Sequence, residues 1–563
     1  MSDKHLHHKP LKKSANPWTL FTFIFVIISF TLTARHCFPN PRIVQQSQHQ
    51  YWRRVNLEPT RGIIQDSKGN ALVISESLPS FAVDPSLLED DDFQKLSSVL
   101  SPDLITKIHR AKDLKSRFMW IGRKVVGDEF EQLKEIRRTV RGVMIYPEQY
   151  RRYTNKKLMS HVLGFCNIDN RGLAGIEQYW DSALYNPPGQ KLVVRRPGSQ
   201  VASLVGQDLE QKSTLPVVTL TIDSRIQYVI EKHLYQAAST NGAKWAAAVC
   251  INPNTGEILS MASYPAYDAS DRKDLQIESL SNSVISRGYE PGSTFKPIYL
   301  GIALERGWAK KDEIFFCPAK FKVADKFIRE SYPVAMGNID TAQLLIKSSN
   351  VGMAQIGIRT EASKIYDTLL SLGFGQPTNI ELPGVAKGIL PLPENWRGVT
   401  PANIAIGQGL AVTPLQLITA MAAIVNGGKL MSPYVVKEVT DSLGDVIYKG
   451  KPEVMREVLT PETTAWIRAA MRRVVLEGTG KRAATEVTDI AGKTGTAQVP
   501  EKGGYSLRRY VGSFIGFWPY EEPKYLMLIV IGEPTSGRIY GGELACPPFK
   551  RIVEEMAELE YFS

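Results

Sequence analysis

One uncharged segment near the N-terminus, from Ser14 to Ala34, constrains the topology of the whole chain. Its 21 residues would make a helix about 31 Å long at about 1.5 Å per residue, roughly the thickness of a bilayer's hydrocarbon core. Lysine-rich flanks stay in the cytoplasm, and four lysines precede the segment: Lys4, Lys9, Lys12 and Lys13. We therefore predict a cytoplasmic tail at 1–13, a single-pass anchor of the inner membrane at 14–34, and an extracytoplasmic remainder.

A cleaved signal peptide is the alternative interpretation of this segment, because the small residues Thr31, Thr33 and Ala34 close it. The apolar run is longer than the core of a usual signal peptide, which favours a retained anchor. Cys37 follows Arg35 and His36 rather than small residues, which argues against a lipid-modified cysteine. Whether the N-terminal segment is ever cleaved stays open.

The composition excludes several classes of protein. A chain of 563 residues with 43% hydrophobic residues is long enough for two or more domains with their own cores. The five cysteines show no Cys-x-x-Cys spacing, so neither a metal site nor a disulfide framework is indicated, and their odd number predicts a free thiol. The net charge of +11 comes without a nucleic-acid motif. The basic clusters at 137–142 and 151–157 are interpreted as solvated faces or as contacts to an anionic partner.

Residues 35–215 are expected to form an elongated domain of mixed structure. A polar linker at 45–50 precedes a strand–turn–strand pattern at 61–77, whose turn is Asp66 to Asn70. The pattern becomes charged and helical from about 88 to 140. A helix at 171–184 and a strand at 191–203 are expected to complete this first domain.

A second domain, residues 216–563, begins where the pattern changes to a strand followed by an amphipathic helix. Asp223 is the expected N-cap of this helix, and Ile226, Ile230 and His233 share one of its faces. Two apolar runs at 246–265 flank Asn254-Thr255-Gly256, which is a strong hairpin signal. A second pair of strands is expected at 510–519 and 525–534, and a closing helix at 549–562. The fold class is therefore α+β, with an antiparallel sheet and helices in the second domain.

The stretch GYEPGSTFKP, residues 288–297, places Ser293 and Lys296 three residues apart after Pro291-Gly292. If a helix begins near Ser293, this spacing sets the hydroxyl and the amine on one helical face. A histidine base for the serine is improbable, because no histidine follows His233. Lys296 becomes the candidate base, which requires burial and nearby positive charge to lower its pKa by roughly 3 units, about 4 kcal/mol.

The Ser-x-x-Lys pattern is weak by itself, since it also occurs at Ser270 and Lys273. The two matches differ in context, because Ser293 precedes an apolar run whereas Ser270 lies in a polar stretch. The alternative interpretation is that Ser293 only caps the N-terminus of a helix.

Two further segments strengthen the functional reading. Ser348 and Asn350 supply a hydroxyl that could relay a proton and an amide that could hold a substrate amide. Lys-Thr-Gly occurs once, at 493–495. In an extended strand Lys493 and Gly495 point to the same face, and a glycine would let a substrate lie against the backbone. Lys493 would supply a second cation, and the hydroxyls of Thr494 and Thr496 could bind a substrate carboxylate.

The order Ser-x-x-Lys, Ser-x-Asn, Lys-Thr-Gly is that of penicillin-binding proteins and class A β-lactamases. The chain resembles a class B penicillin-binding protein, a monofunctional peptidoglycan D,D-transpeptidase, and is most similar to the division-specific FtsI type. The likeness extends beyond the three motifs to RGIIQDSKG, HVLGF with GLAGIEQYWD, TIDSRIQ and GQGLAVTPLQL. It implies a pedestal, or dimerisation-like, domain at 35–215 and a transpeptidase domain at 216–563 with a five-stranded antiparallel sheet. It also implies a periplasmic enzyme anchored in a bacterial membrane.

The resemblance implies a role for each motif residue. Ser293 would attack the penultimate D-Ala carbonyl of a stem peptide, with Lys296 as general base and an oxyanion hole made by the N–H groups of Ser293 and Thr496. Ser348 would pass a proton to the leaving amine, and Asn350 would bind the peptide amide. Three further residues would hold and polarise the carboxylate end of the substrate: Lys493, Thr494 and Thr496, with Gly495 between them.

The resemblance implies no cofactor and no metal. It implies β-lactams as covalent inhibitors, and a membrane-embedded glycan polymerase and divisome proteins as partners, because no glycosyltransferase signature is apparent before residue 216. Ser67 stands where the family usually has arginine after Asp66.

Four alternatives remain open at this point: an elongation-specific transpeptidase, a β-lactamase or D,D-carboxypeptidase, a β-lactam sensor, and a non-catalytic divisome scaffold. The membrane anchor and the long first domain argue against a β-lactamase. The short tail before the anchor argues against a sensor. The sequence does not decide between septation and elongation, and it does not identify the diamino acid of the stem peptide.

Overall fold

The computed structural model describes residues 16–37, 52–56, 60–186, 190–194, 215–271, 276–331, 334–501 and 504–559. The chain divides into two units, one made of 1–59 with 187–211 and the other of 60–186 with 212–563. The predicted tail at 1–13 and the linker at 45–50 lie outside the described residues. Each unit is described by itself below.

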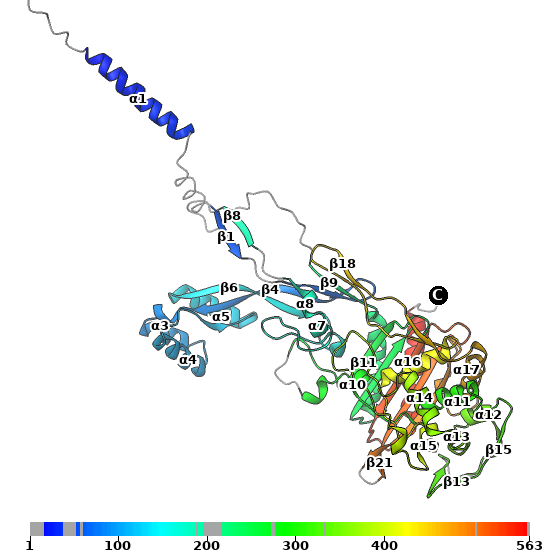
Figure 1. Cartoon of the computed structure of the whole chain (residues 1–563). Coiled ribbons are helices and arrows are strands. Elements are labelled where there is room, and N and C mark those ends of the chain that lie inside the picture. Colours follow the sequence, from blue (N-terminus) through cyan, green and yellow to red (C-terminus); the bar gives the residue numbers. More distant parts are fainter. Residues whose placement is uncertain are drawn as a thin grey trace, which may run out of the picture. The chain divides into compact units, whose positions relative to one another are not determined.

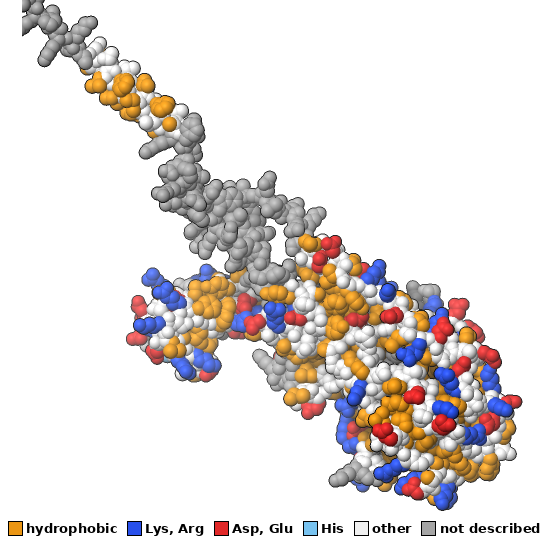
Figure 2. All heavy atoms as spheres, viewed as in Figure 1, with side chains coloured by type: hydrophobic (Ala, Val, Ile, Leu, Met, Phe, Trp, Pro, Cys, Tyr) orange, Lys and Arg blue, Asp and Glu red, His pale blue; other side chains and the backbone are white. Residues whose placement is uncertain are grey.

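The first unit holds α1 (Pro17–Cys37) and an antiparallel pair of strands, β1 (Trp52–Asn56) with β8 (Gln190–Val194). From Pro17 to Ala34 the helix is long and apolar enough to cross a membrane, and none of this stretch is buried in the protein. Figure 2 shows apolar side chains over the visible face of α1. A helix that exposes apolar residues on all sides fits a membrane span. The helix thus fits the predicted single-pass anchor.

The second unit contains a seven-stranded sheet in the order β18-β17-β9-β3-β4-β5, with β6 also pairing with β4. Its strands are β3 (Ile63–Gln65), β4 (Ala71–Val83), β5 (Met119–Gly122), β6 (Val143–Tyr153), β9 (Val217–Leu220), β17 (Val436–Thr440) and β18 (Val446–Lys449). The predicted strand–turn–strand at 61–77 is confirmed as β3 and β4. Strands from both sides of the boundary predicted between 215 and 216 join this one sheet.

Helices cover β4 and its neighbours where the sequence becomes charged and helical. They are α3 (Asp90–Ser97), α4 (Pro102–Asp113) and α5 (Gly127–Thr139). Phe81 from β4 packs in one apolar cluster with Leu96, Ile108 and Leu133 from the three helices. The prediction of a helical segment at 88–140 is therefore confirmed, with the short strand β5 inserted in it.

A five-stranded antiparallel sheet forms the centre of the C-terminal part, in the order β11-β10-β22-β21-β20. Its strands are β10 (Trp245–Ile251), β11 (Ile258–Tyr264), β20 (Ala491–Glu501), β21 (Gly504–Trp518) and β22 (Tyr525–Gly532). Both hairpins expected from the sequence are confirmed, as β10–β11 and as β21–β22. The strand that carries Lys493 lies at the edge of this sheet.

Helices pack on both faces of the five-stranded sheet. Successive side chains along each strand point to opposite faces. Ala248 and Ile529 face a cluster with α9 (Ser224–Thr240) and α19 (Cys546–Glu558), whereas their neighbours Val249 and Leu528 face the larger cluster on the other side. Asp223 caps α9, and Ile226, Ile230 and His233 are buried, as expected. Four cysteines have described side chains and are buried without forming disulfides: Cys166, Cys250, Cys317 and Cys546.

The helices of the other face carry the motif residues or support them (Figure 1). They are α10 (Ser283–Ser286), α11 (Lys296–Glu305), α12 (Thr341–Ile346), α13 (Asn350–Gly357), α14 (Ala362–Ser371), α15 (Thr400–Ala405), α16 (Pro414–Val425) and α17 (Pro461–Leu476). Every residue of α16 is buried. Because α16 packs against α11 and α17 as well as β10 and β22, it fixes the helix of Lys296 against the sheet.

The remaining elements are short. The strand pairs are β2 (Thr60–Arg61) with β7 (Tyr185–Asn186), β12 (Ile314–Cys317) with β15 (Gly337–Asp340), β13 (Lys320–Val323) with β14 (Lys326–Arg329), and β16 (Lys429–Met431) with β19 (Val454–Glu457). The helices are α6 (Ser160–Leu163), α7 (Gly175–Tyr179), α8 (Asp181–Leu184) and α18 (Gly541–Leu544). The predicted helix at 171–184 is thus two short helices, and the strand predicted at 191–203 is seen as β8, since 195–203 lie outside the described residues.

A buried ion cluster fastens β2 and β6 to α7. The Glu177 carboxylate, fully buried, accepts hydrogen bonds from Arg61 Nε and Arg151 Nε, both at 2.6 Å. Arg61 also donates to Asp181 at 2.6 Å. The two guanidinium groups hold the pKa of Glu177 below its usual value against the opposing effect of burial. Removing any one of these charged groups would therefore leave a buried charge without its partner and destabilise the fold.

We predict that Glu177→Ala destabilises the protein by about 3–5 kcal/mol, because two buried guanidinium groups lose their shared partner. The measurement is the urea midpoint of the full chain in detergent. Glu131→Ala is the control, since Glu131 forms an exposed pair with Lys134 worth about 0–1 kcal/mol. Equal shifts for the two variants would contradict the assignment.

Candidate active site

Ser293 lies in a tight turn that precedes the helix of Lys296. The turn, η3 (Gly292–Phe295), is a 3-10 helix, and α11 begins at Lys296. The expected helix start near Ser293 is therefore displaced by three residues. Gly292 has φ +54°, and a Cβ there would lie 3.0 Å from the carbonyl oxygen of Thr496. The glycine thus allows the turn to pack directly against β20.

The Lys296 side chain is fully buried and turned toward the Ser-x-Asn segment. Its Nζ donates to Ser348 O and Asn350 Oδ1, both at 2.8 Å. Ser348 Oγ and Ser349 O lie slightly farther away, at 3.3 and 3.2 Å. These contacts join two motifs that are about fifty residues apart in the sequence.

Lys493 reaches the same point from the opposite wall. It extends from the edge strand β20 and donates to Ser348 Oγ at 2.9 Å and to Thr494 O at 3.0 Å. The hydroxyl of Ser348 is therefore within hydrogen-bond distance of both amines. Ser348 itself has φ +58°, a left-handed conformation that is uncommon for a residue with a side chain and is often held in place at functional sites.

The two amines share one buried space, and this sets their charge. Burial lowers the pKa of Lys296 to about 7 against the opposing effect of Glu330. Burial also lowers the pKa of Lys493 well below its usual value, and the charge of Lys296 lowers it further. The sequence predicted that burial and a nearby positive charge would lower the pKa of Lys296, and burial is the largest cause of that shift. Near neutral pH, Lys296 is thus available both as a base and as an acid.

Ser293 is partly exposed, and its hydroxyl has no hydrogen-bond partner among the described residues. The four oxygen contacts of Lys296 come from residues 348–350. The direct Ser293–Lys296 contact that the spacing suggested is therefore not among the hydrogen bonds of the described residues. Such contacts are often long in unliganded sites and shorten with substrate bound.

Glu330, which no sequence motif indicated, organises the Ser-x-Asn segment. Its buried carboxylate accepts from Ser349 Oγ at 2.6 Å and from the backbone N–H of Asn350 at 2.7 Å. It therefore occupies the N-terminus of α13, where the helix dipole favours a negative charge. Because its charge opposes the fall in the pKa of Lys296, Glu330 also tunes the lysine pair.

The Lys-Thr-Gly segment is held on both sides of the strand. Thr494 Oγ1 and Thr479 Oγ1 are 2.6 Å apart, and Thr496 Oγ1 accepts from the N–H of Gly541 at 3.0 Å. A Cβ on Gly495 would lie 2.8 Å from the Thr294 side chain and 2.5 Å from Ser513 Oγ. The sequence suggested that Gly495 leaves room for a substrate. The missing side chain would instead point at Thr294 and Ser513. The glycine therefore lets η3 approach the strand.

A second carboxylate missed by the sequence lies on the other side of the nucleophile turn. Glu290 Oε1 accepts from the N–H of Gly409 at 2.9 Å and from Tyr505 OH at 3.3 Å. Burial raises the pKa of Glu290 to about 7. Glu290 therefore ties the turn of Ser293 to the loop of Gly409 and to strand β21, which could not be placed near it from the sequence.

The competing Ser-x-x-Lys match gives no comparable site in the described part of the chain. Ser270 is tied through its N–H to Asp268 in a bend, and Lys273 lies outside the described residues. Among residues with described side chains, no three His, Cys, Asp or Glu groups are arranged to hold a metal ion.

Two family models match the chain. The penicillin-binding protein transpeptidase domain matches residues 246–554, and the penicillin-binding protein dimerisation domain matches residues 56–213. The first match alone covers more than half of the chain and contains all three motifs.

Curated relatives match over nearly the whole length. Stage V sporulation protein D of Bacillus subtilis is 32% identical over 546 residues, which cover 94% of this chain and 83% of the relative. Peptidoglycan D,D-transpeptidase FtsI of Escherichia coli K12 is 28% identical over 522 residues, covering 91% and 85%. Penicillin-binding protein 3 of Mycobacterium tuberculosis is a similar solved structure, with a TM-score of 0.69, 25% identity, and coverage of 90% of this chain and 98% of that chain.

We predict that Lys493→Met stabilises the protein by about 1–3 kcal/mol near pH 7, because an apolar side chain of similar length replaces a buried amine. The pKa of Lys493 is lower in the folded than in the unfolded state. Wild-type stability therefore rises with pH toward the unfolded pKa near 10.5. The gain in urea midpoint should accordingly shrink as the pH is raised from 7 to 10. A destabilised variant at pH 7 would contradict this account.

Proposed function

Since the chain belongs to the penicillin-binding protein transpeptidase family, we propose that it cross-links peptidoglycan stem peptides through an acyl-enzyme on Ser293. It is a class B member, because a dimerisation domain precedes the transpeptidase domain. The observation that carries the proposal is the convergence of Lys296 and Lys493 on Ser348 Oγ. Ser293, on the turn before α11, is partly exposed.

In the first step, Ser293 Oγ attacks the carbonyl carbon of the penultimate D-Ala, and Lys296 accepts the hydroxyl proton. The backbone N–H groups of Ser293 and Thr496 stabilise the oxyanion. When the tetrahedral intermediate collapses, the peptide C–N bond breaks and the amine of the terminal D-Ala takes a proton through Ser348. The contacts of Ser348 Oγ with both lysines support this relay, since each amine can supply or receive its proton.

In the second step, an amine of a neighbouring stem peptide attacks the ester carbonyl. A new C–N bond forms, the C–Oγ bond to Ser293 breaks, and a proton of the amine returns to Ser293 Oγ through Lys296. A Lys296 pKa of about 7 suits both steps, because the same group must accept and then donate a proton.

The edge strand β20 supports binding of an extended peptide, since its outer side is not paired with another strand of the sheet. Thr494 and Thr496 would bind the substrate carboxylate beside the amine of Lys493. Asn350 Oδ1 already accepts from Lys296, yet a carbonyl oxygen has two lone pairs and can also accept from a substrate amide. Gly495 contributes by keeping η3 close to this strand.

Several finer statements belong to the same proposal. The N-terminal tail lies in the cytoplasm and the catalytic part in the periplasm, because lysines precede α1. β-Lactams acylate Ser293, which is supported by complexes of the Mycobacterium tuberculosis protein with aztreonam and ampicillin. A membrane-embedded glycan polymerase and divisome proteins are the proposed partners. The pedestal domain spans 35–215 and the transpeptidase domain 216–563.

The septal role is favoured by the FtsI relatives. Another relative, the Bacillus subtilis protein, is named for sporulation and not for division. Cell elongation is the alternative setting for the same reaction.

The proposal predicts a long-lived penicillin adduct on Ser293, because an acyl ester forms when no amine displaces it. Intact mass spectrometry with peptide mapping on the full chain in detergent detects it. Ser293→Ala should abolish the adduct, and Ser270→Ala should keep it. Absence of any adduct on folded protein would contradict the transpeptidase mechanism and favour a non-catalytic scaffold. Rapid loss of the adduct would indicate a hydrolase.

The acylation rate should depend on pH through the amine of Lys296. We expect the second-order rate constant with penicillin to rise about tenfold per unit below pH 7 and to level off above it, as the base loses its proton. Glu330→Gln removes a charge that raises the pKa of Lys296, so the midpoint should move to lower pH. Stopped-flow acylation from pH 5.5 to 9 measures both, and a pH-independent rate would contradict the role of Lys296.

A further inference from the structure

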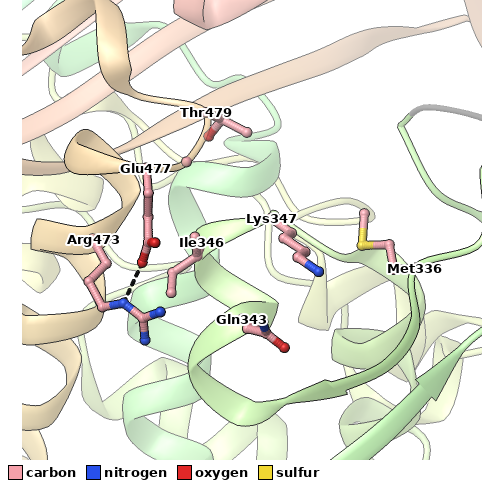
Figure 3. A pocket seen from close by; sticks show the side chains of 8 residues that line it. Met336, Gln343, Ile346, Lys347, Arg473, Glu477 and Thr479 are labelled. Atoms are coloured by element: carbon pink, nitrogen blue, oxygen red, sulfur yellow. Dashed lines mark hydrogen bonds and ion pairs between the residues drawn. The ribbon is translucent and has the colours of Figure 1, made fainter.

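A hollow of about 410 Å³ opens beside the Ser-x-Asn and Lys-Thr-Gly segments. Gln343 and Ile346 of α12 line one wall, and Arg473 at the end of α17 lines the opposite one. Figure 3 shows Lys347 on the side of Ile346 away from Arg473, with its amine directed toward Met336. The volume lies within the range of small-ligand sites in proteins.

The hollow is continuous with the candidate active site at two points. Lys347 directly precedes Ser348, whose hydroxyl meets both buried amines. Thr479, another lining residue, has its Oγ1 2.6 Å from Thr494 Oγ1. The hollow therefore adjoins Ser348 and Thr494, and Thr494 is one of the residues proposed to bind the carboxylate of the terminal D-Ala.

The charges of the hollow leave one cation available. Arg473 is paired with Glu477, Nε to Oε1 at 2.5 Å. Lys347 is exposed, and within the described parts of the chain its ammonium makes no ion pair or hydrogen bond. Ile346 and Met336 add apolar surface next to it. Such a hollow suits a ligand that combines an aliphatic chain with a carboxylate.

We propose that this hollow binds the acceptor stem peptide, with Lys347 holding the glutamate carboxylate of that peptide, remote from the reacting amine. The proposal rests on the transpeptidase function, because only a transferase needs a second peptide. In the proposed reaction the acceptor amine takes the place of the terminal D-Ala, and the hollow adjoins Thr494, which would bind the D-Ala carboxylate, through Thr479. The aliphatic chain of the acceptor's diamino acid lies along Ile346 and Met336.

This placement also explains how an amine could compete with water. An acceptor held at Lys347 delivers its amine next to Ser348 and the ester carbonyl at high effective concentration. The bonds that form and break are those of the second step above, and Lys347 takes no part in them. Lys347 is thus a specificity residue, whose effect appears in the KM for the acceptor.

The test uses the full chain in detergent with a thioester analogue of acyl-D-Ala-D-Ala as donor. The acceptors are two tripeptides, Ala–γ-Glu–diamino acid, one with a free glutamate carboxylate and one with that group amidated. Neither tripeptide can serve as donor, because both lack D-Ala-D-Ala. Rates are normalised to the fraction of enzyme that penicillin acylates.

We expect Lys347→Ala to raise the KM for the acidic acceptor about three- to fivefold and to leave the KM for the amidated acceptor within about twofold, as for loss of one exposed ion pair. Lys347→Arg should restore the preference, and Lys347→Glu should reverse it. Lys364→Ala is the matched control, since Lys364 is an exposed lysine of α14 paired with Glu361 away from the hollow.

Equal KM changes for both acceptors, or none in any Lys347 variant, would overturn the proposal. Wild-type enzyme that uses neither acceptor while still acylated by penicillin would also overturn it. Failure of the proposed function is distinguishable, because Ser293 would then form no adduct with penicillin in the first place.

Discussion

The site depends on one physical constraint, the burial of two lysine amines against a single serine hydroxyl. Each unit of pKa is worth about 1.4 kcal/mol, so lowering Lys296 from 10.5 to about 7 corresponds to about 5 kcal/mol in favour of the neutral amine. That cost is tolerable only if the surroundings are rigid. Two backbone carbonyls, Asn350 and Ser348 satisfy the protons of Lys296, while Lys493 is held within hydrogen-bond reach by an edge strand of the sheet.

The rest of the fold holds these amines in place. The α11 helix carries Lys296 and packs on the wholly buried α16, which in turn packs on the central strands. Gly292 and Gly495 remove the two side chains that would separate the nucleophile turn from β20. Glu330 accepts a hydrogen bond from the N–H of Asn350 at the N-terminus of α13 and so holds Asn350 in position to accept from Lys296. Burial is the largest cause of both pKa shifts, so the shifts depend on these parts keeping the amines away from water.

The sequence predicted much of this arrangement because periodicity and turn residues are local signals. The hairpin at Asn254-Thr255-Gly256, the N-cap at Asp223 and the antiparallel sheet all follow from neighbouring residues. The sequence also brought the three motifs together through their order along the chain. It missed Glu330, because a lone glutamate after a short strand has no periodic or motif signal and its partners lie about twenty residues away. It missed the contact of Glu290 with Tyr505 for the same reason, since 215 residues separate them.

In the proposed mechanism the buried lysines act in the reaction itself, whereas an exposed lysine acts in the choice of acceptor. Lys296 and Lys493 are fully buried, so their charges are set by the fold and respond little to salt. Lys347 is one residue from Ser348 but exposed, so its field is screened by solvent and its loss costs the fold little. A change at Lys347 can therefore alter which acceptor is used without disturbing the acyl-enzyme. Acceptor preference can in this way diverge among proteins that keep the same buried pair.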